Sequence, residues 1–253
     1  MPRDAKHPVK TTERSLQLVE ALKERDRAGV TELASTLEMG KSAVHNHLST
    51  LEEHGYVIRE DDGYRLSLKF LDLGGYLRSR MDLYRVAEPE VDALARESGE
   101  LVNLVVEEGG KAVYLRRSKG PQAVDLDTYV GRHVHMHSSA LGKAILAQLP
   151  EERVDAIVDR HGLPEATPKT ITDRAALAQE LARSRERGFA VDDEERLEGL
   201  RCVAAPVRFA EDVTGAISVS APTARMSDDW SENRFVEQVR GAANVIELNR
   251  YGV

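Results

Sequence analysis

The stretch from residue 30 to residue 68 constrains the fold most strongly, because it predicts four short elements in a fixed order. Apolar residues at helical spacing predict a first helix with Thr31 as its N-cap. A second helix is predicted from Ser42, its expected cap, to the helix-stopping Gly55. Two strands with alternating apolar residues follow, joined by a turn at Asp62-Gly63. Helix, turn, helix and hairpin together form a winged helix-turn-helix, a DNA-binding motif.

The second helix supplies the surface predicted to contact DNA. Its apolar residues Val44, Leu48 and Leu51 form one stripe, so the opposite side faces outward. That outward side is small, polar and free of acids, and Asn46 has the amide needed to bind adenine in a bidentate way. The alternative is an ordinary helical hairpin with a solvated polar face. The predicted base-edge contacts are Ser42, Ala43, His45, Asn46 and Thr50, and the predicted phosphate contacts are Lys41, Arg59 and Arg65.

Length and composition indicate a soluble globular chain of one large or two modest domains. The 253 residues are 41% hydrophobic, and no apolar run approaches the length of a membrane span. The N-terminus has no apolar region typical of a secretory signal, so we expect a cytoplasmic protein with no membrane partner. Cys202 is the only cysteine, which excludes an intramolecular disulfide and a cysteine-built zinc finger.

The net charge of −8 is unevenly distributed along the chain. Residues 1–70 hold 11 basic and 12 acidic side chains, whereas the remainder holds 24 and 31. The acidity therefore lies mainly outside the predicted DNA-binding part. Because that part has few basic residues, we expect its specificity to depend on base edges more than on charge.

The chain divides into four predicted regions. Residues 1–9 are predicted as a disordered tail, 10–71 as the winged helix-turn-helix, 72–84 as a linker and dimerisation helix, and 85–253 as an α+β domain. Gly74-Gly75 predicts a flexible start of the linker helix, and Pro89 predicts a second helix beginning near Ala87. Ordinary core packing is the alternative role for these two helices.

From Leu101 onward, within the predicted α+β domain, the spacing of hydrophobic residues changes from helical to alternating. Strands are predicted at 101–108, 111–118, 123–129, 189–191, 201–208 and 214–220, with a turn around Glu211-Asp212. Helices are predicted at 139–149, 151–160, 173–187 and 227–249, the last two capped by Asp173 and Ser227. Antiparallel strands with interposed helices predict an α+β fold.

Three stretches give the chain a resemblance to a known family. They are GKSAVHNHLSTLEEHGYV, HSSALGKAILA, and GFAVDDEERLEGLRCVAAPV followed by GAISVSAP. With these motifs in this order, the chain resembles the IclR family of transcriptional regulators from about Val9 to Asn249. The resemblance implies a winged helix-turn-helix that binds operator DNA, a linker helix that supports dimerisation, and a GAF-like C-terminal domain that binds a small-molecule effector. Family effectors are often small organic or aromatic acids. Arg208, His133 and His135 depart from the family pattern near the expected pocket.

The same resemblance implies an effector site. By motif position its residues are Ser139, Ala140, Gly142, Asp192, Cys202, Ser218 and Ser220. Ser218 and Ser220 alternate on one strand beside Cys202 on its hairpin partner, and helix-start N–H groups near Ser139 suit a carboxylate. The alternative is structural: Cys202 is a buried small hydrophobe and the serines satisfy backbone groups.

Three other functions compete with a ligand-responsive, dimeric or tetrameric regulator that needs no cofactor. A metal-sensing regulator would use His133, His135 and His137, with Cys202 or Asp192 as a fourth ligand. An enzyme would use Cys202 as nucleophile, with a histidine base oriented by Asp192, but the apolar strand around Cys202 does not stabilise a thiolate. A plain dimeric scaffold would have a vestigial pocket. We therefore expect a regulator and not an enzyme.

Overall fold

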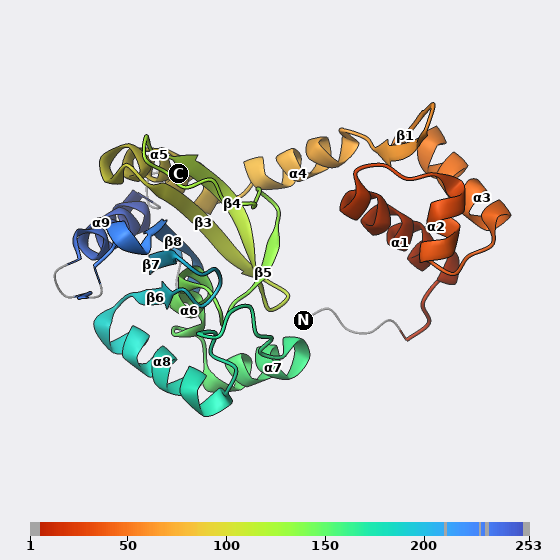
Figure 1. Ribbon diagram of the computed structural model, residues 1–253. Helices are drawn as coiled ribbons and strands as arrows, with labels where there is room; N and C mark the ends of the chain where they lie inside the picture. Colours follow the sequence, from red (N-terminus) through yellow and green to blue (C-terminus); the bar gives the residue numbers. More distant parts are fainter. Residues whose placement is uncertain (1–5, 210–211, 228, 231–232, 250–253) are drawn as a thin grey trace. The chain divides into compact units, whose positions relative to one another are not determined.

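The computed structural model describes residues 6–209, 212–227, 229–230 and 233–249 and divides into two compact units (Figure 1). One unit ends at Leu77 and the other begins at Arg78, inside the predicted linker at 72–84. Residues 1–5 of the predicted tail, and residues 210–211 of the predicted turn, lie outside the described residues. Within the described part of the chain, none of the helices has the length and apolarity needed to cross a membrane.

The N-terminal unit is a winged helix-turn-helix, as predicted. Its elements are α1 (Lys10–Arg25), α2 (Val30–Thr36), α3 (Lys41–Glu53), β1 (Val57–Glu60) and β2 (Gly63–Leu66). A small core of buried residues from all three helices and the hairpin holds them together, with Leu18, Leu33 and Leu48 fully buried. The predicted caps Thr31 and Ser42 are wrong. Each helix begins earlier, after an extended glycine.

The hairpin of this unit is anchored to the loop before α2. The backbone of Tyr64 exchanges hydrogen bonds with that of Ala28, at 2.9 and 3.1 Å. Gly63 has a φ of +152°, and a Cβ there would lie 2.7 Å from the carbonyl oxygen of Ala28. Any side chain at this position would therefore collide with backbone. The strand register pairs Glu60 with Gly63, so the turn itself is formed by residues 61 and 62.

Two helices follow the wing, as predicted, but with other bounds: α4 (Lys69–Ser79) and α5 (Asp82–Ser98). Gly74-Gly75 lies in the middle of α4 instead of forming a flexible start, and Pro89 lies inside α5 instead of near its first turn. The break between the helices falls just before Asp82, because Met81 is extended and packs against the core of the C-terminal unit. No residue of α4 is buried.

The C-terminal unit is a six-stranded antiparallel sheet in the order β5-β4-β3-β8-β7-β6. Its strands are β3 (Leu101–Glu108), β4 (Lys111–Lys119), β5 (His133–His135), β6 (Ala190–Asp193), β7 (Leu200–Phe209) and β8 (Asp212–Pro222). Its further helices are α6 (Ala140–Leu146), α7 (Glu151–His161), α8 (Arg174–Arg187) and α9 (Arg234–Asn249), with a 3-10 turn at Thr223–Arg225. The α+β fold class is as predicted.

Helices cover both faces of this sheet (Figure 1). Helices α5 and α9 pack on one face over alternating residues such as Val102 and Leu104. Helix α6, with α7 and α8 outside it, packs on the other face over Val105 and Ala204. Every residue of α6 is buried, because it lies between the sheet and these outer helices. The polar residues of the second face therefore project toward α6.

Two predictions for this unit are wrong. Residues 123–129 are not a strand, because the side chain of Arg117 satisfies the carbonyls of Leu126 and Thr128 in place of a neighbouring strand. Ser227 does not cap the last helix. Its hydroxyl accepts a hydrogen bond from the N–H of Asp229 in a local turn, and α9 begins only at residue 234.

Candidate functional site

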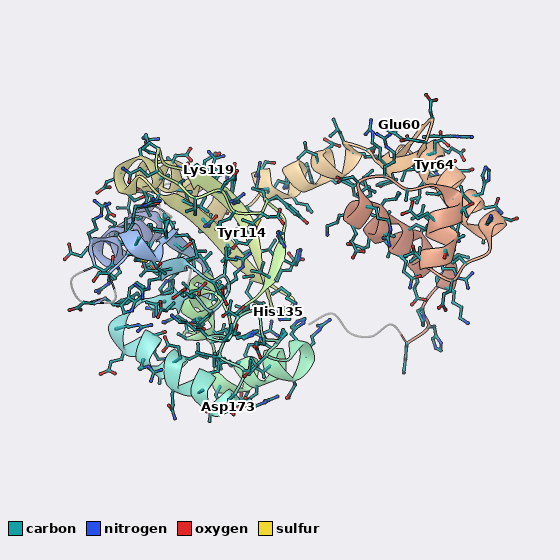
Figure 2. The ribbon with its side chains drawn as sticks, in the orientation of Figure 1. Glu60, Tyr64, Tyr114, Lys119, His135 and Asp173 are labelled. Carbon is teal, nitrogen blue, oxygen red and sulfur yellow. The ribbon has the colours of Figure 1, made fainter. Side chains whose placement is uncertain are left out.

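A cavity of about 180 Å³ lies between the sheet and the first turn of α6. Its walls combine polar sheet residues with leucines and an exposed rim. The lining residues are Asn103, Tyr114, Leu126, Asp127, Ser139, Ala140, Leu141, Asp192, Arg196, Leu197, Leu200, Cys202, Ser218 and Ser220. Figure 2 labels Tyr114, which comes from β4.

Six of the seven residues predicted for the effector site line this cavity. Gly142 does not. Its N–H donates to the capping hydroxyl of Ser139, and a Cβ on it would lie 2.2 Å from the carbonyl oxygen of Met136. The glycine is therefore required by the close approach of α6 to the preceding segment, while Ser139 and Ala140 face the cavity.

The inner wall of the cavity is a polar patch on an otherwise apolar sheet. In the register of β3, β7 and β8, Ser218 lies opposite Asn103 and Ser220 lies opposite Cys202. Ser218 is fully buried, and its Oγ has no hydrogen-bond partner among the described residues. An unsatisfied buried hydroxyl is costly, so a polar group of a bound molecule would complete this wall.

Asp192 contributes a buried carboxyl to the cavity. Its Oδ1 accepts hydrogen bonds from the backbone N–H groups of Glu195 and Arg196, at 2.8 and 3.3 Å. Burial raises the pKa of Asp192 to about 7, against the opposing charge of Lys143. Lys143 itself is fully buried and pairs with Glu195, whose own pKa is raised by burial.

Cys202 is buried among apolar residues of the same face. Burial raises the pKa of its thiol, and the neighbouring carboxyl of Asp192 raises it further. A thiol in this environment stays protonated and is a poor nucleophile. The cysteine therefore contributes packing and a weakly polar surface to the cavity.

The sequence did not predict Asn103, Tyr114 or Arg196 as site residues. Asn103 was detectable in principle, because it is the one polar residue in the apolar run 101–106. Tyr114 and Arg196 come from segments 82 positions apart and meet only in the fold, where Arg196 donates to the hydroxyl of Tyr114. Nothing in their local sequence indicates this contact.

Of the three histidines proposed as a metal alternative, only His135 and His137 are neighbours, with ring centres 5.6 Å apart. The ring of His133 contacts the carbonyl of Gly131, and that of His137 contacts the carbonyl of Pro164. His135 lies beside Lys111, and burial lowers the pKa of His135 to about 4. Over the residues that the structure describes, no group of three His, Cys, Asp or Glu side chains is arranged to hold a metal ion.

The predicted DNA-contacting residues of α3 are mostly accessible. Lys41, Ser42, His45, Asn46 and Thr50 are exposed, and Ala43 is half-buried. The outward side is not free of acids, however, because Glu52 and Glu53 are exposed in the last turn. The polar, acid-free surface is therefore confined to the first three turns of the helix.

The two arginines of the wing differ in how available they are to contact phosphate. Arg59 is exposed, with its guanidinium 6.0 Å from the ring centre of Tyr64. Arg65 instead forms a 2.6 Å ion pair with Glu60, which also pairs with Arg27. A phosphate contact by Arg65 would have to compete with this pair, so Arg59 is the more available of the two predicted contacts.

Comparison with known proteins assigns the family. The model of the IclR helix-turn-helix domain matches residues 11–61, and that of the bacterial transcriptional regulator IclR C-terminal region matches residues 76–248. The chain belongs to the IclR family. It is therefore a DNA-binding transcriptional regulator, and its matched families and relatives are regulators and not enzymes.

Relatives of this IclR-family chain match it along most of its length. It is 34% identical to the HTH-type transcriptional regulator ArcR of Halobacterium salinarum, covering 92% of this chain and 91% of that one. It is 32% identical to XynR of Escherichia coli, covering 92% and 94%. The Thermotoga maritima IclR structure has a TM-score of 0.77 at 27% identity, covering 95% and 98%. An IclR homolog from Microbacterium hydrocarbonoxydans shares the fold, with a TM-score of 0.82 at 24% identity over 96% and 100%.

Proposed function

We propose that this IclR-family regulator binds a small organic acid in the cavity beneath α6, and that the bound effector changes its affinity for operator DNA. The observation behind this proposal is the polar wall of the cavity, with the buried Ser218 hydroxyl left without a partner among the described residues. A vestigial pocket in a plain scaffold would be expected to fill with apolar side chains instead.

The size of the cavity supports a small effector. Apolar cavities of about 150 Å³ in proteins hold benzene, so 180 Å³ suits a molecule of about one ring or a short chain. The Microbacterium structure is a complex with 4-hydroxybenzoate, which is a one-ring acid, and it shares this fold. Ser139, Ala140, Asp192, Cys202, Ser218 and Ser220 are the proposed effector contacts.

A homodimer is the proposed DNA-binding form, with a tetramer built from two dimers as the alternative. The support comes from α4, which has no buried residue although Leu71, Leu73, Tyr76 and Leu77 lie on it. Tyr76 is 60% exposed and Leu77 is 66% exposed. Large apolar side chains gathered on one exposed helix are typical of a surface that a second copy covers.

In the dimer, two copies of α3 would contact two operator half-sites, about one or more helical turns apart. Base-edge contacts are proposed for Ser42, Ala43, His45, Asn46 and Thr50, and phosphate contacts for Lys41, Arg59 and Arg65. Effector binding would alter the spacing or orientation of the paired helices, which makes the coupling reciprocal between effector and DNA. Such a regulator acts in the cytoplasm, where its operator lies.

Asn46 provides the direct test. Genomic footprinting first recovers the bound operator, and fluorescence anisotropy then measures affinity at fixed salt. Asn46→Ala should weaken operator binding by about five- to a hundredfold, because a bidentate base contact is lost.

Gln17→Ala is the matched control, since it removes an exposed amide from α1 in the same unit. We expect Gln17→Ala to bind like the unmodified protein. Unchanged affinity and unchanged sequence preference for Asn46→Ala would contradict the proposed recognition face.

A further inference from the structure

Two guanidinium groups beside the cavity lack a carboxylate partner. Among the described residues, neither Arg196 nor Arg117 forms an ion pair, although most buried or half-buried arginines of this unit do. Burial lowers the pKa of Arg117, Tyr114 and the carboxylate of Asp125 oppose this shift, and the nearby charge of Arg196 adds to it. Two like charges at a partly buried site are unfavourable unless an anion joins them.

Arg196 is held in place by hydrogen bonds from both its backbone and its guanidinium. Its backbone N–H donates to Asp192, and its Nη1 donates to the hydroxyl of Tyr114. The guanidinium lies 5.6 Å from the ring centre of Tyr114. A guanidinium has five N–H donors, and the described side-chain contact uses only Nη1, so the other donors of this cavity-lining residue have no described partner.

Arg117 lies behind this wall and contacts several of its parts. It donates to the main-chain carbonyls of Leu126 and Thr128 and, at 3.4 Å, to the side-chain oxygen of Asn103. Leu126 and Asn103 both line the cavity. Arg117 therefore positions the wall and adds positive potential without needing to touch the bound molecule.

Asp125 acts on Arg117 through its charge without forming an ion pair with it, and its carboxylate pairs with Lys119 at 2.7 Å. The two acidic residues that line the cavity, Asp127 and Asp192, are engaged elsewhere. Asp127 lies on the rim and pairs with Arg132 at 3.5 Å. Asp192 has one oxygen engaged by two backbone N–H groups, and burial favours its neutral form. The wall formed by Arg196, with Arg117 behind it, thus keeps a net positive charge when the cavity is empty.

We propose that Arg196 is the carboxylate anchor of the effector site, positioned by Tyr114 and supported by Arg117. This inference rests on the proposed effector cavity and gives it a ligand chemistry. The effector is a small acid of about one ring or a short chain, whose carboxylate binds Arg196. A second polar group, a hydroxyl or carbonyl, completes the hydrogen bonding of Ser218.

The test measures the melting temperature of the full-length protein with acids and their neutral counterparts. The probes are benzoate, 4-hydroxybenzoate, salicylate, mandelate and lactate, each beside its primary amide at the same concentration. At least one acid should raise the melting temperature in a saturable way. Its amide, equal in size but uncharged, should bind about ten- to a hundredfold more weakly, because it loses the charge-assisted bonds.

Variants of the anchor identify its role. Arg196→Gln should lower affinity for the acid about ten- to a hundredfold and leave that for the amide nearly unchanged. Arg196→Lys should recover part of the loss, because it restores the charge but not the fork of donors. Tyr114→Phe should reduce the preference for acid over amide. Arg174→Gln is the charge-matched control, since Arg174 pairs with Asp155 and Asp159 and lies outside the cavity lining.

Three results would overturn the inference. If amides bind as well as acids and Arg196→Gln alters neither affinity, the anchor is wrong while the effector cavity of the proposed function stands. If Arg196→Gln and Arg174→Gln weaken acid binding equally, net charge is responsible and not the anchor. If no acid or amide of the panel changes the melting temperature, both the anchor and the small-acid effector are wrong. Unchanged circular dichroism and melting of the unliganded variants confirm that they fold.

Discussion

Asp192 couples the folding of the C-terminal unit to pH. Burial raises its pKa from an ordinary value of 3.8 to about 7. Between these values the folded protein holds a proton that the unfolded chain has already released. Stability from this group is therefore largest at low pH and falls as the pH rises from about 4 to about 7.

Asp192→Asn should remove this pH dependence. The amide oxygen can still accept the bonds from Glu195 and Arg196, but the side chain cannot ionise. The unfolding free energy of the unmodified protein minus that of the variant should fall by up to about 4 kcal/mol between pH 4 and pH 8. Urea denaturation at a series of pH values measures this difference.

His135 titrates with the opposite sign, because its lowered pKa destabilises the folded state at low pH. It is present in both proteins, so its contribution cancels in the difference. Two pH profiles that run parallel from pH 4 to pH 8 would show that Asp192 ionises as freely in the folded state as in the unfolded chain.

At the residue scale the sequence predicted part of the lining of the candidate cavity. Ser139, Asp192 and Cys202 were identified because each lies in a motif whose local spacing is preserved. Arg196 and Tyr114 were missed because their contact depends on two distant segments and on a loop, for which no sequence period exists. Gly142 was assigned to the cavity although its role is steric, a distinction that only the distance to Met136 reveals.

At the scale of an element, the close packing of helix α6 allows a clear prediction. A Cβ on Gly142 would overlap the backbone of Met136, and all seven residues of the helix are buried, so neither side can move away easily. Gly142→Ala should lower the unfolding free energy by about 1–3 kcal/mol or more.

Gly241→Ala is the control for this prediction, measured by the same urea titration. Gly241 lies inside α9 of the same unit, and a Cβ there would meet nothing within 4 Å. Alanine should stabilise that helix by about 0.5–1 kcal/mol. Equal effects of the two substitutions would show that α6 and residue 136 can separate at little cost.

Most elements were predictable because their hydrophobic period is regular, whereas most of the predicted N-caps were wrong. Asp173 caps α8 as predicted, accepting from the N–H of Ala176. The errors arose where tertiary contacts replaced local signals. Arg117 holds the segment 123–129 that was predicted as a strand, and the packing of Met81 places the helix break earlier than Pro89 predicted.

The oligomer is a property of the whole molecule and can be tested through α4. Leu73→Ser combined with Leu77→Ser should reduce the assembly to a monomer at micromolar concentration, because the proposed contact loses its apolar area. Light scattering coupled to size-exclusion chromatography measures the mass. Leu248→Ser removes a comparably exposed leucine from α9 and should leave the mass unchanged. A dimer that survives the double substitution would place the interface elsewhere.

The cavity draws its walls from residues as far apart as Asn103 and Ser220 in the chain. No short segment could bind the effector alone, so only the folded C-terminal unit forms the site. An effector present at a hundred times its dissociation constant would then stabilise the folded chain against unfolding by about 2.7 kcal/mol. In a cell this lowers the fraction open to proteases, so the supply of effector would set the lifetime and copy number of the regulator as well as its occupancy.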